Sequence, residues 1–292
     1  MGRFTVFKPI IGPVLGLAAY SLYSLGDASI RGIGTSLPPF ELAFVGAVVS
    51  LMLSPLVLGR SLSAIELVRP HRWWRWLLRG CFAVGGTVSG IYAWSRLPLA
   101  EAAAILFLAP LLTSTLIPFC LREKTTLLNW LASLIGFLGV LIVLRPGLRE
   151  LNSGHLAALV CALCGAGTGL LLHATRDEES AASMYGASAL SVLAISGIAA
   201  VSHWVSPSGS AFWLIVAYAS CGALANVVLM YAWRRGPAFS VASTQYSQLL
   251  WSIGLGFVFF SETPDVATRV GVTVIALAGI WPLLKHTNDS VN

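Results

Sequence analysis

The chain has 292 residues, of which 57% are hydrophobic and 10% charged, with a net charge of +6 and a mean hydropathy of +0.81. Soluble domains carry about 25% charged residues, so this composition excludes a water-soluble fold and indicates a protein that folds in a lipid bilayer. The Lys and Arg residues lie in short segments between apolar runs rather than on one domain face, so the positive charge does not indicate a nucleic-acid partner.

Apolar windows bounded by charged residues, Pro or Gly predict ten helices. They lie near residues 10–31, 39–59, 73–95, 99–121, 127–145, 154–174, 183–204, 211–233, 238–260 and 266–285. The runs are far longer than barrel strands, and a backbone in lipid must satisfy its hydrogen bonds within its own segment, so the spans are expected to be helical. The first run resembles a signal peptide but is followed by many others, so we expect a retained first span. The predicted fold class is an all-α integral membrane protein with ten transmembrane helices.

The first span carries a polar stripe formed by Tyr20, Tyr23, Ser24, Asp27 and Arg31. The spacing of i, i+3, i+4 and i+7 places these residues on one helix face, which should contact protein or water rather than lipid. Two interpretations of Asp27 stay open. It forms a local i,i+4 ion pair with Arg31 at the mouth of the helix, or it is a group that responds to protons or cations.

A stretch of the chain occurs twice, at residues 92–123 and 231–262, with a constant offset of 139 and no gaps. The two copies share nine residues, which are Tyr92/Tyr231, Ala93/Ala232, Trp94/Trp233, Arg96/Arg235, Pro98/Pro237, Ala103/Ala242, Leu111/Leu250, Leu116/Leu255 and Glu123/Glu262. Such self-similarity predicts an internal duplication. We therefore expect two units, residues 1–147 and 148–292.

The charges predict how these units are oriented. With ten spans, thirteen Lys and Arg residues fall on the side of both termini and five on the other side, so both termini are expected to be cytoplasmic. The offset of 139 covers five helices, an odd number, so the second unit should be inverted relative to the first, with Glu123 and Glu262 on opposite sides. Inverted repeats place a solute site near the bilayer midplane and allow alternating access to it.

Packing signals support a compact bundle. Residues 86–90 and 165–169 form GxxxG patterns, which allow close helix approach. Pro110 and Pro118 each remove a backbone hydrogen bond from the fourth span, so a kink is expected there. The tract RPHRWWRWLLR (69–79) places tryptophans beside arginines, and this favours a membrane-surface anchor over a binding motif.

The ninth span carries a second polar stripe of Gln245, Gln248 and Ser252. Glutamines at this spacing suit either the backbone of neighbouring helices or the polar groups of a solute. Polar and aromatic residues of several spans are the candidates for a substrate cavity, namely Tyr20, Tyr23, Ser24, Asp27, Tyr92, Phe107, Asn226, Gln245, Tyr246, Gln248 and Trp251. His173 is expected to be satisfied locally, and Glu41 and Glu101 are expected to begin helices, where the dipole favours carboxylates.

Other classes of site find no support in the sequence. There is no Gly-rich phosphate loop, no HExxH motif and no grouping typical of a nucleophilic enzyme, so we expect neither an enzyme nor a bound cofactor or metal. Cys161 and Cys164 form a CxxC pattern inside an apolar run, which favours small packing residues over a metal or redox site.

The repeated stretches resemble a known family. The segments LPLAEAAAILFLAPLL (97–112), LREK (121–124), GFLGVLIVLRPG (136–147) and STQYSQLLWSIGLGFVFFSETPD (243–265) are similar to EamA-type transporters of the drug/metabolite transporter superfamily. Pro110 and Glu123 match the usual proline and glutamate of that family, whereas Tyr20 and Tyr23 stand where relatives often carry tryptophan, and Ser261 where glycine is usual. The resemblance implies two inverted five-helix repeats, alternating access and a central cavity lined mainly by helices 1, 3, 4, 6, 8 and 9.

We therefore expect a secondary transporter of the inner membrane that moves a small organic metabolite, an amino acid or an aromatic, amino-acid-like compound. Uptake of S-adenosylmethionine or a riboflavin-like solute is the alternative within the same fold, and a passive channel or a membrane scaffold is the alternative from another class. A strongly anionic cargo is not expected, because no paired buried cations are evident. The expected partners are the substrate and membrane lipid; coupling to a proton or a counter-substrate stays open, and a monomer is favoured over an obligate dimer.

Overall fold

The computed structural model describes residues 8–58, 64–121, 126–145, 151–201, 204–207 and 209–289, and within these residues it contains helices and no strand. The helices are α1 (Lys8–Ile33), α2 (Pro39–Leu58), α3 (Ala64–Leu67), α4 (Trp73–Arg96), α5 (Leu99–Leu106), α6 (Leu108–Cys120), α7 (Leu127–Leu144), α8 (Ser153–Ala174), α9 (Ala181–Val201), α10 (Gly209–Arg235), α11 (Ala238–Ser243), the 3-10 turn η1 (Thr244–Tyr246), α12 (Ser247–Phe260) and α13 (Val266–Asp289). Every apolar window predicted to be helical is occupied by one of them or by a broken pair. The short helix α3 was not predicted.

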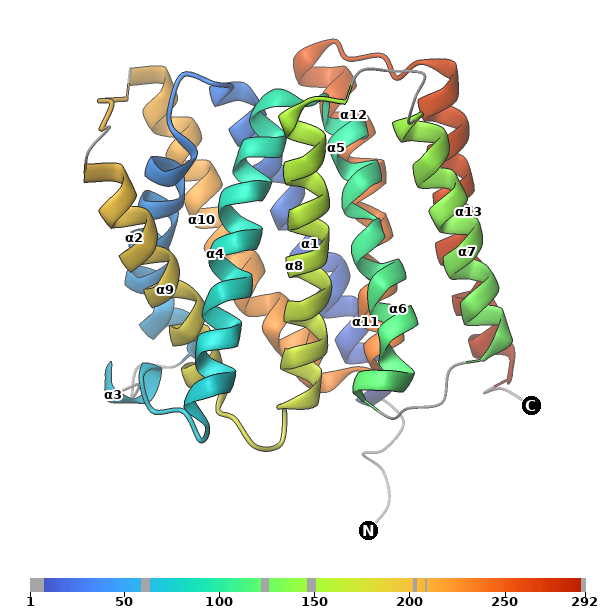
Figure 1. Cartoon of the computed structure of the whole chain (residues 1–292), viewed down its shortest axis with the longest axis horizontal. Helices are drawn as coiled ribbons and strands as arrows, with labels where there is room; N and C mark the ends of the chain where they lie inside the picture. The colour runs from blue at the N-terminus through green and yellow to red at the C-terminus, as the bar shows by residue number, and fades with distance from the viewer. Residues whose placement is uncertain are drawn as a thin grey trace.

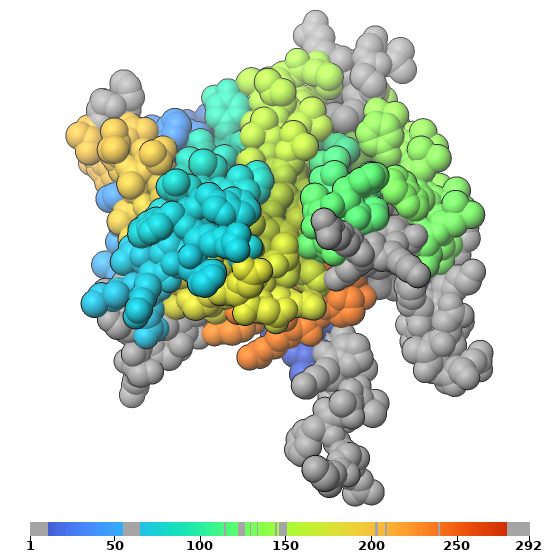
Figure 2. Space-filling view, turned by 60° about the horizontal axis from the view of Figure 1, so that its bottom comes forward, coloured from blue at the N-terminus to red at the C-terminus, as the bar shows by residue number. Residues whose placement is uncertain are grey.

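The long helices stand side by side in one bundle, with α1 beginning and α13 ending at its lower edge (Figure 1). The most extensive pairings are α1 with α10, α7 with α13, α4 with α8, and α2 with α9. Seen from below, α4 lies against α8, and α6 with α7 forms the adjoining part of the surface (Figure 2).

The described helices suit a bilayer. Four helical spans are long and apolar enough to cross a membrane, namely Leu99–Cys120, which comprises α5 and α6, and Ser153–Ala174, Ala181–Val201 and Gly209–Arg235. On α12, the side chains of Phe257, Val258 and Phe259 are 64–71% exposed. An apolar face of this kind would be a liability in water but is stable against lipid. The chain is therefore a multi-pass membrane protein.

Small residues let the helices approach closely. A Cβ atom added to Gly139 of α7 would lie 2.9 Å from the carbonyl oxygen of Gly271 in α13, and one added to Gly271 would lie 2.7 Å from the carbonyl oxygen of Gly139. Both contacts are too short for a real side chain, so the crossing needs both glycines. The predicted GxxxG face of α4 packs against Cys161 and Cys164 of α8, which act there as small packing residues.

Two of the helical spans are broken near their middle. The break between α5 and α6 falls at Phe107, three residues before Pro110, and the break between α11 and α12 falls at the turn η1. Pro110 has no N–H group to bond the carbonyl of Leu106, one helical turn earlier, which accounts for the kink predicted in this span. The position of Tyr246 in η1 equals that of Phe107 plus the offset of 139.

Candidate functional site

A cavity of about 290 Å³ lies among α1, α2, α4, α8, α9 and α10, with the broken spans at its side. Small-molecule sites occupy about 300–1,000 Å³, so this cavity has the size of a compact metabolite site. Its wall is mostly apolar and includes the buried indoles of Trp94 and Trp233. Six of the residues predicted for a substrate cavity lie on this wall, namely Tyr20, Tyr23, Asp27, Asn226, Gln245 and Gln248.

Two polar pairs join α1 to the second broken span inside the cavity. The Gln248 amide nitrogen donates a hydrogen bond to Asp27 Oδ2 at 2.5 Å, and the Tyr20 hydroxyl donates to Gln245 Oε1 at 3.3 Å. The Gln245 amide nitrogen in turn donates to the carbonyl oxygen of Leu106 at 3.3 Å, which is the carbonyl that Pro110 leaves without its usual partner. Both glutamines line the cavity, and Gln245 also satisfies a neighbouring backbone group, which is one of the two roles predicted for this stripe.

Three of the predicted cavity residues lie behind the wall instead. Phe107 is fully buried and stacks on Tyr246, with ring centroids 5.4 Å apart and planes inclined at 28°. Ser24 is buried and donates to the carbonyl of Tyr20 in its own helix at 2.8 Å. The periodicity of the first span placed Ser24 on the right helix face, but its short side chain turns back to the backbone.

Two more predicted residues lie away from the cavity. The hydroxyl of Tyr92 is hydrogen bonded to Ser153 Oγ at 2.9 Å, at the start of α8. The indole N–H of Trp251 donates to Ser21 Oγ at 3.0 Å, and this side chain is 45% exposed. Trp251 lies between the polar residues Gln248 and Ser252 in sequence, but a one-residue step rotates a helix by about 100°, which turns Trp251 outward.

The local ion pair between Asp27 and Arg31 is not formed. Arg31 instead binds Glu262, whose Oε1 accepts from Arg31 Nε and Nη2, both at 2.8 Å. The other carboxylate oxygen of Glu262 accepts from the backbone N–H of Leu99 at 2.8 Å, at the first turn of α5. Arg31 lies near the end of its helix and reaches this neighbouring loop, while Asp27 turns into the cavity. The matching residue Glu123 lies outside the described residues.

Arg79 is a cavity residue that the sequence analysis missed. It was grouped with the surface tract 69–79, but it lies two turns inside α4, is only 5% exposed and lines the cavity. Its Nη1 donates to Thr168 Oγ1 at 3.4 Å, and its Nε has no hydrogen-bond partner among the described residues. Its position on the same face of α4 as Ala83, Gly86 and Gly90 could have revealed it, because that face packs inward.

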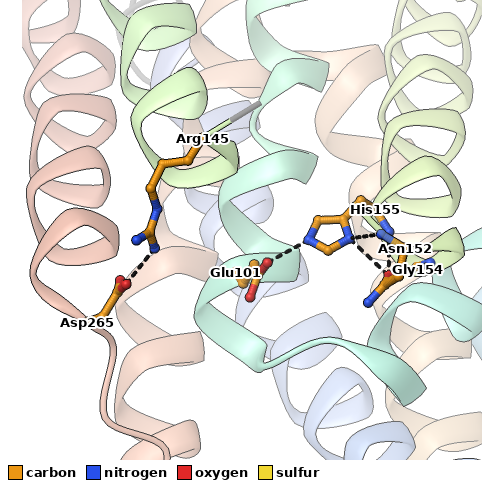
Figure 3. A network of polar contacts seen from close by, with 6 residues as sticks. All are labelled: Glu101, Arg145, Asn152, Gly154, His155 and Asp265. Carbon is orange, nitrogen blue, oxygen red and sulfur yellow. Dashed lines mark hydrogen bonds and ion pairs between the residues drawn. The ribbon is translucent and has the colours of Figure 1, made fainter. Parts of the chain in front are cut away.

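Polar contacts close the upper end of the bundle around the start of α5 and α8 (Figure 3). Glu101 in the first turn of α5 binds His155 Nε2 at 2.7 Å, and the other ring nitrogen of His155 lies against Asn152, which caps α8. Arg145 at the end of α7 binds Asp265 before α13 at 2.5 Å. The prediction that Glu101 lies at the start of a helix is confirmed, and its carboxylate also links α5 to α8.

Contacts at the lower end join the connection before α4 to the connection before α9. The carboxylate of Glu179 accepts from the backbone N–H groups of His71 and Arg72 at 2.8 and 2.9 Å. Arg75 and Glu178 form an ion pair at 2.7 Å. His173 is satisfied locally, as expected, with Nδ1 3.2 Å from the carbonyl oxygen of Trp233. These groups hold the ends of helices and do not reach the cavity.

Comparisons with known proteins agree with this architecture. Residues 10–145 match the EamA-like transporter family. A solved crystal structure of another protein, 21% identical, covers 93% of this chain and 98% of its own with a TM-score of 0.69, which shows a shared fold.

Among curated proteins, an S-adenosylmethionine uptake transporter of Rickettsia felis is 28% identical over 88% of this chain and 87% of its own. A riboflavin transporter of Vibrio cholerae is 24% identical, with 92% of each chain covered. A pseudopaline exporter of Pseudomonas aeruginosa is also 24% identical, over 92% of this chain and 94% of its own. These relatives point to a transporter rather than an enzyme. Residues 10–145 are thus similar to the EamA-like transporter family, and most of the chain is similar to bacterial proteins that are named as transporters.

Proposed function

We propose that the chain is a secondary transporter of the bacterial inner membrane, and that its cargo is a small metabolite with an amino-acid group. S-adenosylmethionine is the first candidate. The observation that carries the proposal is the cavity, where polar groups that include Asp27, Gln248 and Tyr20 face a mostly apolar space with aromatic walls inside a multi-pass bundle.

Alternating access is supported by the way the two broken spans meet. The breaks occur at positions that correspond at the offset of 139, and Phe107 of one copy stacks directly on Tyr246 of the other. A pair of equivalent residues can touch in this way when two repeats are related by an axis that passes between them. The contact therefore favours residues 1–147 and 148–292 as the two repeats.

Other repeated residues make the same contacts in both copies. Arg96 lies over the ring of Tyr92 at 4.1 Å, and Arg235 lies over the ring of Tyr231 at 4.9 Å. Pro98 precedes α5, and its counterpart Pro237 precedes α11. Local geometry that survives with the sequence pattern is the expected result of a duplication.

The helix pairings support an inverted arrangement. Exchange of the two proposed halves converts the pairing of α1 with α10 into the pairing of α8 with α4, and both are extensive. In the pairings of α2 with α9 and of α7 with α13, the exchange replaces each helix by its partner, so both pairings stay the same. A topology map with cysteines at positions 123 and 262 tests the inversion, since labelling of both from the same side of the membrane contradicts it.

The cavity favours a cargo with an aromatic part and a polar or cationic part. Aromatic walls suit a flat heterocycle, and Asp27 offers a carboxylate with an adjacent amide. S-adenosylmethionine combines an aromatic base, an amino-acid group and a cationic sulfonium, and several relatives at 27–29% identity are named as its uptake transporters. A riboflavin-like solute, which has no charged group, would leave Asp27 without a charged partner.

Transport in liposomes tests the proposal. Purified protein is expected to give saturable uptake of labelled S-adenosylmethionine and accelerated exchange when unlabelled compound is present inside. Empty liposomes and the unrelated dye calcein, used to detect leaks, are the controls. Uptake that does not saturate and shows no exchange would indicate a passive channel. The absence of uptake for S-adenosylmethionine and for a panel of amino acids would contradict the proposed function.

A further inference from the structure

Arg79 is an unusual residue for a membrane interior. It lies six residues after the start of α4, about 9 Å along the helix, and is 5% exposed. A cation at this depth is costly unless it is paired or solvated, so such residues commonly mark a path for a solute. Among the described residues no carboxylate lies within ion-pair distance of its guanidinium, whereas Arg31, Arg75 and Arg145 each have one.

The surroundings of Arg79 leave part of its hydrogen-bonding capacity unused. Its single described hydrogen bond, to Thr168 Oγ1 at 3.4 Å, is long and goes to a neutral hydroxyl. The buried Nε has no partner in the described part of the chain; Nε of Arg75 and of Arg145 has none either, but those two guanidinium groups each bind a carboxylate, and Arg79 does not. A guanidinium presents its donors in a planar fork that matches two oxygens of one carboxylate. The group that would complete this arrangement is therefore an anion with two oxygens, which enters from the cavity.

The cavity thus has two charged ends. Asp27 lies six residues before the end of α1, and Arg79 six residues after the start of α4. Both helices begin at the lower edge of the bundle (Figure 1). Their positions within these helices therefore place Asp27 towards the upper end and Arg79 towards the lower end. Helix rise places the two residues about 15–20 Å apart along the axis. The carboxylate and the ammonium of one amino-acid group are too close together to reach both.

We propose that Arg79 binds the carboxylate of the cargo, so that an elongated molecule lies with its acidic group at the lower end and its other end towards Asp27. One unpaired cation matches a singly charged carboxylate better than a doubly charged phosphate. The inference rests on the proposed transport function and adds the acidic group and the orientation of the cargo.

Binding of matched ligand pairs tests this assignment. The ligands are S-adenosylmethionine and its decarboxylated form, which keeps the sulfonium and the amine, and the readout is concentration-dependent thermal stabilisation of the purified protein. We expect the acid to bind about 10- to 100-fold more tightly, as for a hydrogen-bonded charge pair. Arg79→Gln should abolish this preference, and Arg79→Lys, which keeps the charge but not the planar fork, should keep only part of it. Arg75→Gln, one turn away and outside the cavity, is the matched control and should leave it unchanged.

Several outcomes would overturn the assignment. Equal binding of both ligands by the native protein, or a preference for the acid that survives in Arg79→Gln, removes the role of Arg79 while the transport proposal stands. If the native protein binds neither ligand, S-adenosylmethionine fails as the cargo, and L-methionine and L-phenylalanine are then compared with their amides. A lack of preference for these acids, or of any binding, overturns the assignment as well.

A second measurement needs no variant and covers the case in which Arg79→Gln does not fold. Phenylglyoxal modifies accessible guanidinium groups, and peptide mass spectrometry reports its reaction at each arginine. The acid that binds is expected to protect Arg79 while its decarboxylated or amide counterpart, at a concentration that gives equal occupancy, does not. Equal protection by both counterparts would show that Arg79 is covered without contacting the carboxylate, and this would refute the proposal.

Discussion

Substitution of Gln245 by leucine tests how the two broken spans are held together. The Gln245 amide bonds the carbonyl of Leu106, which lacks its helical partner because residue 110 is proline. Its oxygen accepts from the Tyr20 hydroxyl. Gln245→Leu therefore leaves one buried carbonyl unsatisfied and removes the acceptor of a buried hydroxyl, while the side-chain volume changes little.

The expected cost follows from these contacts. A buried polar group left without a partner costs about 1–3 kcal/mol. Hydrogen bonds between membrane helices average about 0.6 kcal/mol and reach about 1.7 kcal/mol. Both bonds of Gln245 are 3.3 Å long, which is beyond the optimum, so the low part of these ranges applies. We expect Gln245→Leu to reduce the free energy of unfolding by about 1–1.5 kcal/mol.

A double-mutant cycle with Pro110→Ala isolates the carbonyl. Alanine supplies the missing backbone N–H, so the carbonyl of Leu106 regains a partner and Gln245→Leu should cost about 0.5–1 kcal/mol less in this background. Tyr20→Phe separates the second bond. The assay is reversible unfolding of the purified protein in mixed micelles. If Gln245→Leu costs the same with Pro110 and with alanine, within about 0.3 kcal/mol, the explanation of the break is wrong.

Three further predictions concern carboxylates. Asp27→Asn is expected to flatten the pH dependence of uptake in liposomes if transport is coupled to this group, whereas an unchanged pH profile would leave Asp27 a purely structural role. Glu262→Gln should lower the unfolding free energy by about 2 kcal/mol, because Arg31 loses its charged partner and then competes with the Leu99 N–H for the single remaining oxygen. If the effects of Glu262→Gln and Arg31→Gln simply add in a double-mutant cycle, the contact between these two side chains is contradicted. Hydrogen bonds from Thr268 and Arg145 hold the pKa of Asp265 at about 2, below its usual range. Asp265→Asn should therefore destabilise the protein equally at about pH 7 and about pH 5, by at most about 1 kcal/mol because the side chain is half exposed, and this effect should disappear as the pH falls towards about 2. An effect that already vanishes at about pH 5 would refute the lowered pKa.

The helices could be predicted from the sequence because the information is local. Runs of about 20 apolar residues ended by charges, Pro or Gly give each span, and the observed ends fall within a few residues of the windows. The helix α3 escaped because four residues, Ala64–Leu67, are too few to show a period. The kink at Pro110 was predicted for the right reason, but its compensation by Gln245 was not, since the two residues lie far apart in the chain.

The site was predictable only in part, for a related reason. Periodicity identified the stripe of Tyr20, Tyr23 and Asp27, and all three lie on the cavity wall. Partners across the bundle leave no local signal, so Asp27 was given its i,i+4 neighbour Arg31 instead of Gln248, which is 221 residues away. Arg79 was missed because its charge placed it with the tract before it, although its helix position placed it inside.

The proposed duplication gives a reason for the contact between Gln245 and Leu106, because these positions correspond to each other at the offset of 139. The first copy has Leu106 with Pro110 four residues later, and the second has Gln245 with Leu249 four residues later. Proline at both 110 and 249 would leave two carbonyls, those of residues 106 and 245, without their helical partners. Leucine at both 106 and 245 would offer no side-chain donor to either carbonyl. The two differences therefore fit as a pair, in which one copy frees a carbonyl and the other supplies its donor. Because Gln245 also lines the cavity and accepts from Tyr20, a cargo that displaces the Tyr20 hydroxyl would act directly on the point where the broken spans meet.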